Sequence, residues 1–325
     1  MSKPQQLVFY GAPGTGKSFA INREAGDRKQ IRVTIHPEFT YSDFAGQLLP
    51  RSDEEGNVLF SFVPGPFTEA LKYAFENREQ EVVLILEELS RGNVAAIFGD
   101  LFQLLDRNSD TWNSAYPVHN SQIASCLPEI EENVAARTPE NIFLPANLSI
   151  FATVNTSDQN VMPMDTAFKR RFDWQYVSTA PRKSDSSDTE FLNNPTIVLT
   201  RNNGAKIKTD WVQLYQSVND YILSGNSPLG ANEDKQVGQF FIKFDDSLIA
   251  RTAQEETQAL SEVLEILANK LLMYLWEDVE GRSGLAGAGI KRLFLPDISS
   301  FGELNKRAKD SQVFSDFFFD EYLVK

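Results

Sequence analysis

The feature that most constrains this chain is the octapeptide GAPGTGKS, Gly11 to Ser18. It matches the pattern G-x-x-x-x-G-K-[ST] and lies between an apolar run, LVFY at 7–10, and a segment of helical character, SFAINREAG at 18–26. Glycines at these spacings let the backbone wrap closely around a phosphate, which the N–H groups of the loop and of the following helix then bind. The motif therefore predicts a nucleotide-phosphate site on a strand–loop–helix unit.

Each part of this loop has an expected role. Lys17 places a positive charge at the β and γ phosphates, and the hydroxyl of Ser18 can bind Mg²⁺. The residues expected to bind the nucleotide phosphates are Gly11, Ala12, Pro13, Gly14, Thr15, Gly16, Lys17 and Ser18.

A second constraint is the stretch EVVLILEELSRGN at 81–93, in which a run of apolar residues leads directly into Glu87 and Glu88. A buried strand can end on two like charges if a bound Mg²⁺ offsets them. P-loop proteins need an acidic residue at the end of a neighbouring strand to hold that ion. We therefore expect Glu87 to serve the metal together with Ser18, and Glu88 to act as the catalytic base that polarises the attacking water.

The stretch IFATVNTSDQNVMPMDTAFKRRFDW at 150–174 supplies further candidates. Asn155 ends an apolar strand expected beside that of Glu87, where its amide could sense the γ phosphate or position water. Arg170 and Arg171 lie on a predicted short helix. A guanidinium stabilises charge that develops on a transferred phosphoryl group, and it can come from a neighbouring subunit. Which arginine acts as this finger stays open, and both could instead form surface ion pairs.

Composition limits the remaining possibilities. The 325 residues carry a net charge of −14, which argues against binding DNA through bulk electrostatics. The single cysteine, Cys126, suits a reducing cytoplasm, and two histidines argue against a histidine-based metal site. No apolar run reaches the length of a membrane span. We expect a cytoplasmic protein that does not enter a membrane.

Strand patterns alternate with helical patterns over the first half of the chain, which predicts an α/β fold with a parallel sheet between helical layers. The expected large nucleotide-binding domain spans 1–180, with a polar insertion at about 106–147. A polar, Ser- and Asn-rich linker is expected at 181–209, followed by a smaller, mainly helical domain at 210–325.

Several of these stretches together resemble an AAA+ protein, and more narrowly the McrB-type motor of modification-dependent restriction systems. The resemblance rests on the P-loop, on LEELSRGN at 86–93, on VNTSDQNVMPMDTAFKRRF at 154–172 and on the late helical domain. Further stretches that resemble that subgroup are HPEFTYSDFAGQLLP at 36–50, FVPGPFTEALKYA at 62–74, EDKQVGQFFIKF at 233–244 and NKLLMYLWEDV at 269–279.

The resemblance implies an AAA+ large subdomain followed by a helical lid. It also implies an NTPase that forms a hexameric ring, with active sites at subunit interfaces and Arg170 or Arg171 acting in trans. Proteins of this group prefer GTP to ATP, use Mg²⁺, and drive DNA translocation for an McrC-type nuclease subunit.

Two departures from the family pattern matter. Ser90 stands where relatives often carry Asn, whose longer side chain would help to hold the lytic water. McrB-like proteins also usually carry a DNA-reading domain ahead of the motor, whereas Gly11 lies only ten residues into this chain. We therefore expect DNA to be contacted through the nuclease partner or through an N-terminal domain outside this sequence.

Two other functions stay open at the level of sequence. One is an ATP-driven protein remodeller of the MoxR or dynein-related type. The other is a nucleotide-gated scaffold whose assembly matters more than its turnover.

Overall fold

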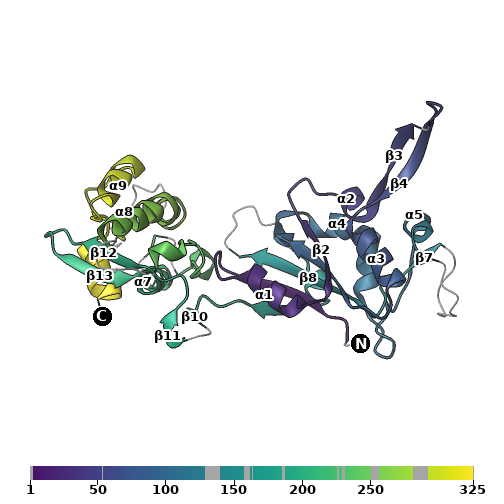
Figure 1. Ribbon diagram of the computed structural model, residues 1–325, viewed down its shortest axis with the longest axis horizontal. Coiled ribbons are helices and arrows are strands. Elements are labelled where there is room, and N and C mark those ends of the chain that lie inside the picture. The colour runs from purple at the N-terminus through teal and green to yellow at the C-terminus, as the bar shows by residue number, and fades with distance from the viewer. Residues whose placement is uncertain are drawn as a thin grey trace. The chain divides into compact units, whose positions relative to one another are not determined.

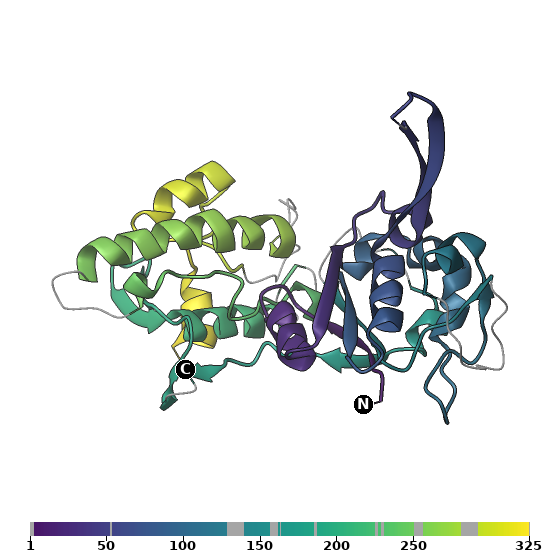
Figure 2. The same cartoon turned by 45° about the vertical axis from the view of Figure 1, so that its right-hand side comes forward.

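A computed structural model describes residues 3–52, 54–128, 140–156, 162, 164–184, 187–224, 227–228, 231–249, 256–280 and 292–324 (Figures 1 and 2). Its contacts divide the chain into two compact units. The first comprises Met1–Tyr10 and Lys17–Tyr176, and the second comprises Gly11–Gly16 and Val177–Lys325. Each unit has a hydrophobic core of its own.

The first unit is built on a five-stranded sheet with the order β2–β5–β8–β1–β9. β5 is parallel to both of its neighbours, β2 and β8, and β1 is parallel to β9. The strands are β1 (Gln6–Gly11), β2 (Lys29–Thr34), β5 (Val82–Glu87), β8 (Leu148–Asn155) and β9 (Asp173–Tyr176). Val82 to Leu86 are fully buried, as expected for a strand covered on both faces. The α/β prediction is confirmed.

Helices of the first unit bury their apolar faces against this sheet. α1 (Lys17–Ala25) contacts β8, and α3 (Pro66–Glu76) packs against β2, β5 and β8. Pro66 opens α3, where its missing N–H leaves no hydrogen bond unmade. The short helices are α2 (Tyr41–Ala45), α4 (Val94–Phe98), α5 (Ser121–Ser125) and α6 (Thr166–Lys169).

The segment 93–107 does not form one continuous helix. α4 ends at Gly99, whose φ of 50° lies in the left-handed region, and Gly99–Leu105 continues as tighter 3-10 turns. The expected polar insertion follows, and its described part contains a small antiparallel pair of β6 (Val118–His119) and β7 (Asn141–Ile142).

A β-hairpin that the sequence analysis missed projects from the first unit (Figure 1). It consists of β3 (Gly46–Ser52) and β4 (Val58–Pro64), paired in antiparallel register. Leu48, Val58 and Phe60 lie on one of its faces and are 50%, 63% and 69% exposed. The base of the hairpin is fixed by the carbonyl of Ala45, which accepts hydrogen bonds from the hydroxyl of Thr68 and the N–H of Gly65.

The second unit is mainly helical, with small sheets at its start. Residues 181–209, predicted as a linker, instead carry β10 to β12 and most of β13. The alternation in β12 buries Ile197 and Leu199 in the core of this unit. The strands are β10 (Lys183–Ser184), β11 (Ser187–Phe191), β12 (Thr196–Thr200) and β13 (Lys206–Asp210).

The α-helices in the described part of the second unit are α7 (Trp211–Leu223), α8 (Glu256–Leu267), α9 (Phe301–Ala308) and α10 (Asp316–Phe318). α8 runs on through wider helical turns to Val279, so one long helix extends from Glu256 to Val279. Short turns occupy Glu233–Lys235, Asp246–Leu248 and Phe319–Leu323.

Candidate functional site

The parallel neighbours β5 and β8 end on the polar residues that the sequence singled out, Glu87 and Asn155. Carboxyl ends of parallel strands share one edge of the sheet, and that edge is where α/β proteins place their ligands. The structure thus brings Glu87, Glu88 and Asn155 together within the first unit.

Glu88 is held in an unusual conformation by its neighbours. Its φ of 57° and ψ of 40° are left-handed, which costs a non-glycine residue roughly 1–2 kcal/mol. The side-chain amide of Asn155 donates to both carboxylate oxygens of Glu88, at 2.8 and 2.7 Å. The guanidinium of Arg91 lies 3.4 Å from the same carboxylate. The strand end therefore presents a carboxylate whose position is fixed from two sides.

Thr153 is a site residue that sequence reasoning missed. Its hydroxyl accepts a 2.9 Å hydrogen bond from the backbone N–H of Glu88 and donates a 2.7 Å hydrogen bond to the carboxylate of Glu87. The side chain is only 2% exposed. One hydroxyl thus connects both acidic residues to β8. The signal in the sequence is a polar Thr near the end of the mostly apolar run LSIFATV, which also contains Ser149.

Glu87 has a second partner in Arg32 of β2, which forms an ion pair with its other carboxylate oxygen. Mg²⁺ in nucleotide sites uses one or two protein oxygens and takes its remaining ligands from phosphates and water. The carboxylate of Glu87 and the hydroxyl of Ser18, an exposed residue, are the protein oxygens that would hold such an ion. Among the described residues no group of three acidic, His or Cys side chains gathers as a metal cage.

The phosphate loop joins β1 to α1. Gly14 and Gly16 have φ values of 75° and 88°, which side chains rarely allow, so these two glycines are required for the path of the loop. The hydroxyl of Thr15 closes the loop internally by donating to the carbonyl of Ala12 at 3.0 Å. Lys17 opens α1 and is 7% exposed.

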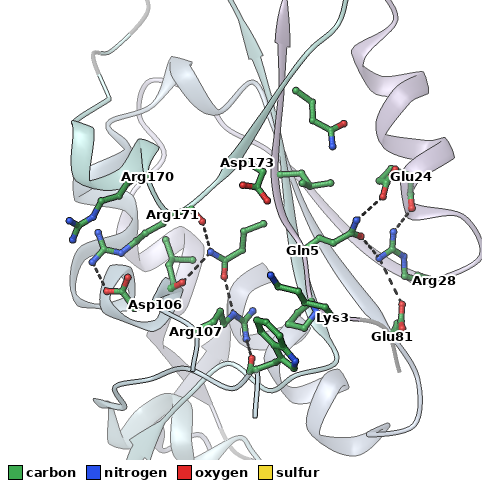
Figure 3. A pocket seen from close by; sticks show the side chains of 16 residues that line it. Lys3, Gln5, Glu24, Arg28, Glu81, Asp106, Arg107, Arg170, Arg171 and Asp173 are labelled. Carbon is green, nitrogen blue, oxygen red and sulfur yellow. Dashed lines mark hydrogen bonds and ion pairs between the residues drawn. The ribbon is translucent and has the colours of Figure 1, made fainter. Parts of the chain in front are cut away.

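Arg170 and Arg171 lie elsewhere in the first unit. Both line a cavity of about 870 Å³, together with Gln5 and Gln6 at the start of β1, Glu81 before β5 and Asp173 at the start of β9 (Figure 3). The arginines therefore occupy the amino edge of the sheet, the edge opposite to Glu87 and Asn155. The structure does not bring them to the carboxylates of their own chain.

The two arginines differ in their surroundings. Arg171 is 10% exposed, pairs with Asp106 at 2.6 Å, donates to the carbonyl of Ala167 at 2.8 Å and lies 4.2 Å from the ring centre of Phe102. Arg170 is exposed. Arg171 is thus engaged in holding its own unit together, whereas Arg170 extends from the surface.

Arg107 anchors the floor of the same cavity. Its guanidinium donates to the side-chain oxygen of Gln6 and to the carbonyls of Trp112, Leu144, Pro145 and Leu148. Burial lowers the pKa of Arg107 to about 9, so the group still carries its charge at neutral pH. Its bonds fix the polar insertion to the sheet, which gives Arg107 a structural role.

Ser90 is fully buried next to Glu88. Its backbone carbonyl accepts from the N–H of Met162 at 2.9 Å, and its hydroxyl has no hydrogen-bond partner among the described residues. A serine in this place therefore does not add an exposed side chain beside the carboxylates.

Comparisons with known proteins give the family of this chain. The family model of the AAA domain, dynein-related subfamily, matches residues 6–172. The component YdiS of the type II restriction enzyme BsuMI from Bacillus subtilis is 35% identical over 308 residues, covering 86% of this chain and 80% of that protein. This chain is an AAA+ protein of the McrB type. As such it is a nucleoside-triphosphate hydrolase related to components of restriction systems.

A second relative of this McrB-type protein is the EcoKMcrB subunit of a type IV methyl-directed restriction enzyme from Escherichia coli. It is 25% identical over 197 residues, covering 58% of this chain and 38% of that subunit. A solved structure from Cytophaga hutchinsonii aligns with 54% of this chain and 42% of its own at 17% identity, with a TM-score of 0.33. None of the described helices is long and apolar enough to cross a membrane.

Proposed function

We propose that this McrB-type protein hydrolyses GTP with Mg²⁺, forms a ring of identical subunits, and drives DNA translocation for a nuclease partner in a restriction system. The observation that carries the proposal is the fixed position of the Glu88 carboxylate. The side-chain amide of Asn155, at the end of β8, donates to both of its oxygens, and the neighbouring Glu87 carboxylate is held by the hydroxyl of Thr153. A catalytic base must be held in position if it is to polarise one water among many.

In this proposal, different residues of the chain bind the phosphates, hold the metal and activate the water. The loop from Gly11 to Gly16, with Lys17, binds the phosphates, and Ser18 and Glu87 provide oxygens for the metal. Mg²⁺, when bound, neutralises charge on the β and γ phosphates. Glu88 accepts a proton from the attacking water as the new oxygen–phosphorus bond forms and the bond to the β phosphate breaks. Asn155 keeps the Glu88 carboxylate aimed at that water.

The position of Arg170 supports active sites shared between subunits. β5 has six residues, so its two ends lie roughly 20 Å apart at about 3.3 Å per residue. An arginine at the amino edge is therefore too far away to reach a phosphate beside Glu88 of its own chain. A ring in which the amino edge of one subunit faces the next subunit's nucleotide would bring Arg170 to the reacting group.

GTP and the nuclease partner enter the proposal through the resemblance to McrB and through relatives named as restriction-enzyme components. The charge of −14 supports contact with DNA through a partner, since phosphate contacts require clustered Lys and Arg. One further function is also supported. The matching family model is described as dynein-related, which fits an ATP-driven protein remodeller.

Phosphate release from GTP and from ATP, measured with Mg²⁺ over a range of protein concentrations, tests the proposal. Turnover of GTP that rises more steeply than protein concentration would support a ring with shared sites. Turnover restricted to ATP, and unaffected by a nuclease subunit from the same system, would favour the remodeller instead.

Mixing two inactive variants tests the shared site directly. Glu88→Gln removes the base, and Arg170→Ala removes the proposed finger. In mixed rings, some interfaces place the intact Glu88 of one subunit against the intact Arg170 of the next, so activity should return on mixing. An Arg170→Ala variant that keeps full activity, or a mixture that stays inactive, would contradict the trans role of Arg170.

A further inference from the structure

Within the second unit, the phosphate loop Gly11–Gly16 packs against a short segment, Gln236–Phe241, which we call the strap. The N–H of Gly238 donates to the carbonyl of Pro13 at 2.9 Å, and the N–H of Phe240 donates to the carbonyl of Gly14 at 2.8 Å. A Cβ built on Gly238 would lie 2.4 Å from the nitrogen of Thr15. Loop and strap thus meet backbone to backbone, and no side chain fits between them at this point.

Arg182 adds a positive charge to this contact. Its guanidinium donates to the carbonyl of Thr15 at 3.3 Å. A Cβ built on Gly16 would lie 3.4 to 3.5 Å from Nη1, Nη2 and Cζ of Arg182, so the guanidinium lies directly beside Gly16. Gly16 immediately precedes Lys17, the expected phosphate-binding lysine.

The main chain of Arg182 is fixed by a buried glutamine of the strap. The N–H of Arg182 donates to the side-chain oxygen of Gln239 at 2.6 Å, and the side-chain amide of Gln239 donates to the carbonyl of Arg182 at 3.2 Å. Gln239 is 2% exposed, and its own carbonyl accepts from the indole of Trp211 and the amide of Asn193. The unit therefore holds Arg182 at the loop through a network that reaches its core.

From this placement we propose that Arg182 is a nucleotide-binding residue, contacting the phosphate chain beside Gly16. The inference rests on the proposed nucleotide site and adds a residue to it. An arginine is always charged at neutral pH and offers a planar fork of donors that suits phosphate oxygens. The two hydrogen bonds between Gln239 and the main chain of Arg182 fix the point from which this guanidinium extends.

The test measures nucleotide affinity with the full chain, independently of turnover. Equilibrium binding of GTP, GDP, ATP and ADP with Mg²⁺ is compared between the wild type, Arg182→Gln and Arg182→Lys. Lys183→Gln is the matched control, because it removes the same charge from the adjacent, exposed position. Lys17→Ala reports on the phosphate loop itself.

Loss of a charge-assisted contact should weaken nucleotide binding about tenfold or more in Arg182→Gln, with a smaller loss in Arg182→Lys and none in Lys183→Gln. Raised salt should weaken the wild type more than Arg182→Gln. The melting temperature without nucleotide should stay near that of the control, while the stabilisation by added GTP or ATP should shrink.

Two outcomes would overturn the inference. If Lys17→Ala abolishes binding while Arg182→Gln binds as the wild type does, the nucleotide site stands and Arg182 does not belong to it. If Arg182→Gln melts lower without nucleotide and binds nucleotide with unchanged affinity, Arg182 only stabilises the fold and does not contact the nucleotide. A wild-type chain that binds none of the four nucleotides would refute the proposed function and the inference together.

Discussion

Replacing Thr153 with Val should disturb both acidic residues of the site through a single hydroxyl. Valine has nearly the shape of threonine, so the change leaves no cavity, but it removes the acceptor of the Glu88 N–H and a donor to Glu87. Each lost hydrogen bond costs about 0.5–1.5 kcal/mol, and more where the partner stays buried or charged. With Thr153 only 2% exposed, water cannot easily replace the hydroxyl. We expect a total loss of about 1–3 kcal/mol in the free energy of unfolding.

The same change should lower turnover more than nucleotide affinity, because the left-handed backbone at Glu88 depends on its N–H bond while the phosphate loop does not. Urea unfolding of the full chain gives the stability, and phosphate release with a binding titration gives the two functional quantities. Thr153→Ser is the matched control, since it keeps the hydroxyl. A Thr153→Val protein that is as stable and as active as Thr153→Ser would refute the bridging role.

Further variants test separate contacts. Glu88→Gln should bind nucleotide normally and lose turnover, which single-turnover phosphate release would detect; retained turnover would exclude Glu88 as the base. Arg171→Ala should lower the free energy of unfolding by about 1–3 kcal/mol, because it breaks the pair with Asp106 and the contact with an aromatic ring. Arg170→Ala should melt like the wild type, and equal destabilisation by the two would contradict their different surroundings. Hydrogen bonds from the hydroxyl and then the N–H of Thr40 hold the pKa of Asp43 below its ordinary value of 3.8. The stabilisation from this carboxylate is therefore present above pH 3.8 and is lost as pH falls through the lower pKa of the folded protein. Asp43→Asn should melt lower than the wild type near pH 6 and similarly at strongly acidic pH; a difference that persists in acid would contradict this linkage.

Much of the first unit follows from its sequence pattern. β5 is an apolar run that ends on Glu87, and β8 is mostly apolar, with Ser149 and Thr153 inside it and Asn155 at its end. Such runs are readable because a strand buried on both faces carries mainly apolar side chains. The phosphate loop is readable because its glycines are required by backbone geometry. The roles of Thr153 and Arg32 were not predictable, since they depend on which strands become neighbours in the sheet. The difference between Arg170 and Arg171 likewise depends on where Asp106 lies in the folded chain.

The missed strands have a different cause. β3 and β4 expose side chains on both faces, so their sequence lacks the alternation that marks a strand packed on a core. The strands at 183–210 stand among Ser, Asn and Asp, whose abundance indicates loops. There the packing of Ile197 and Leu199 outweighs the weak local preference, and packing is visible only in the fold.

The hairpin of β3 and β4 also has a mechanical consequence. Each strand has seven residues, which makes a ribbon about 20 Å long, and the two strands form a sheet of their own among the described residues. At its base the carbonyl of Ala45 accepts hydrogen bonds from Gly65 and Thr68. Because the ribbon is anchored at its base, a small rotation of the base displaces its far end by a larger distance. A rotation of about 10° at α2 or α3 would sweep its tip through roughly 3–4 Å.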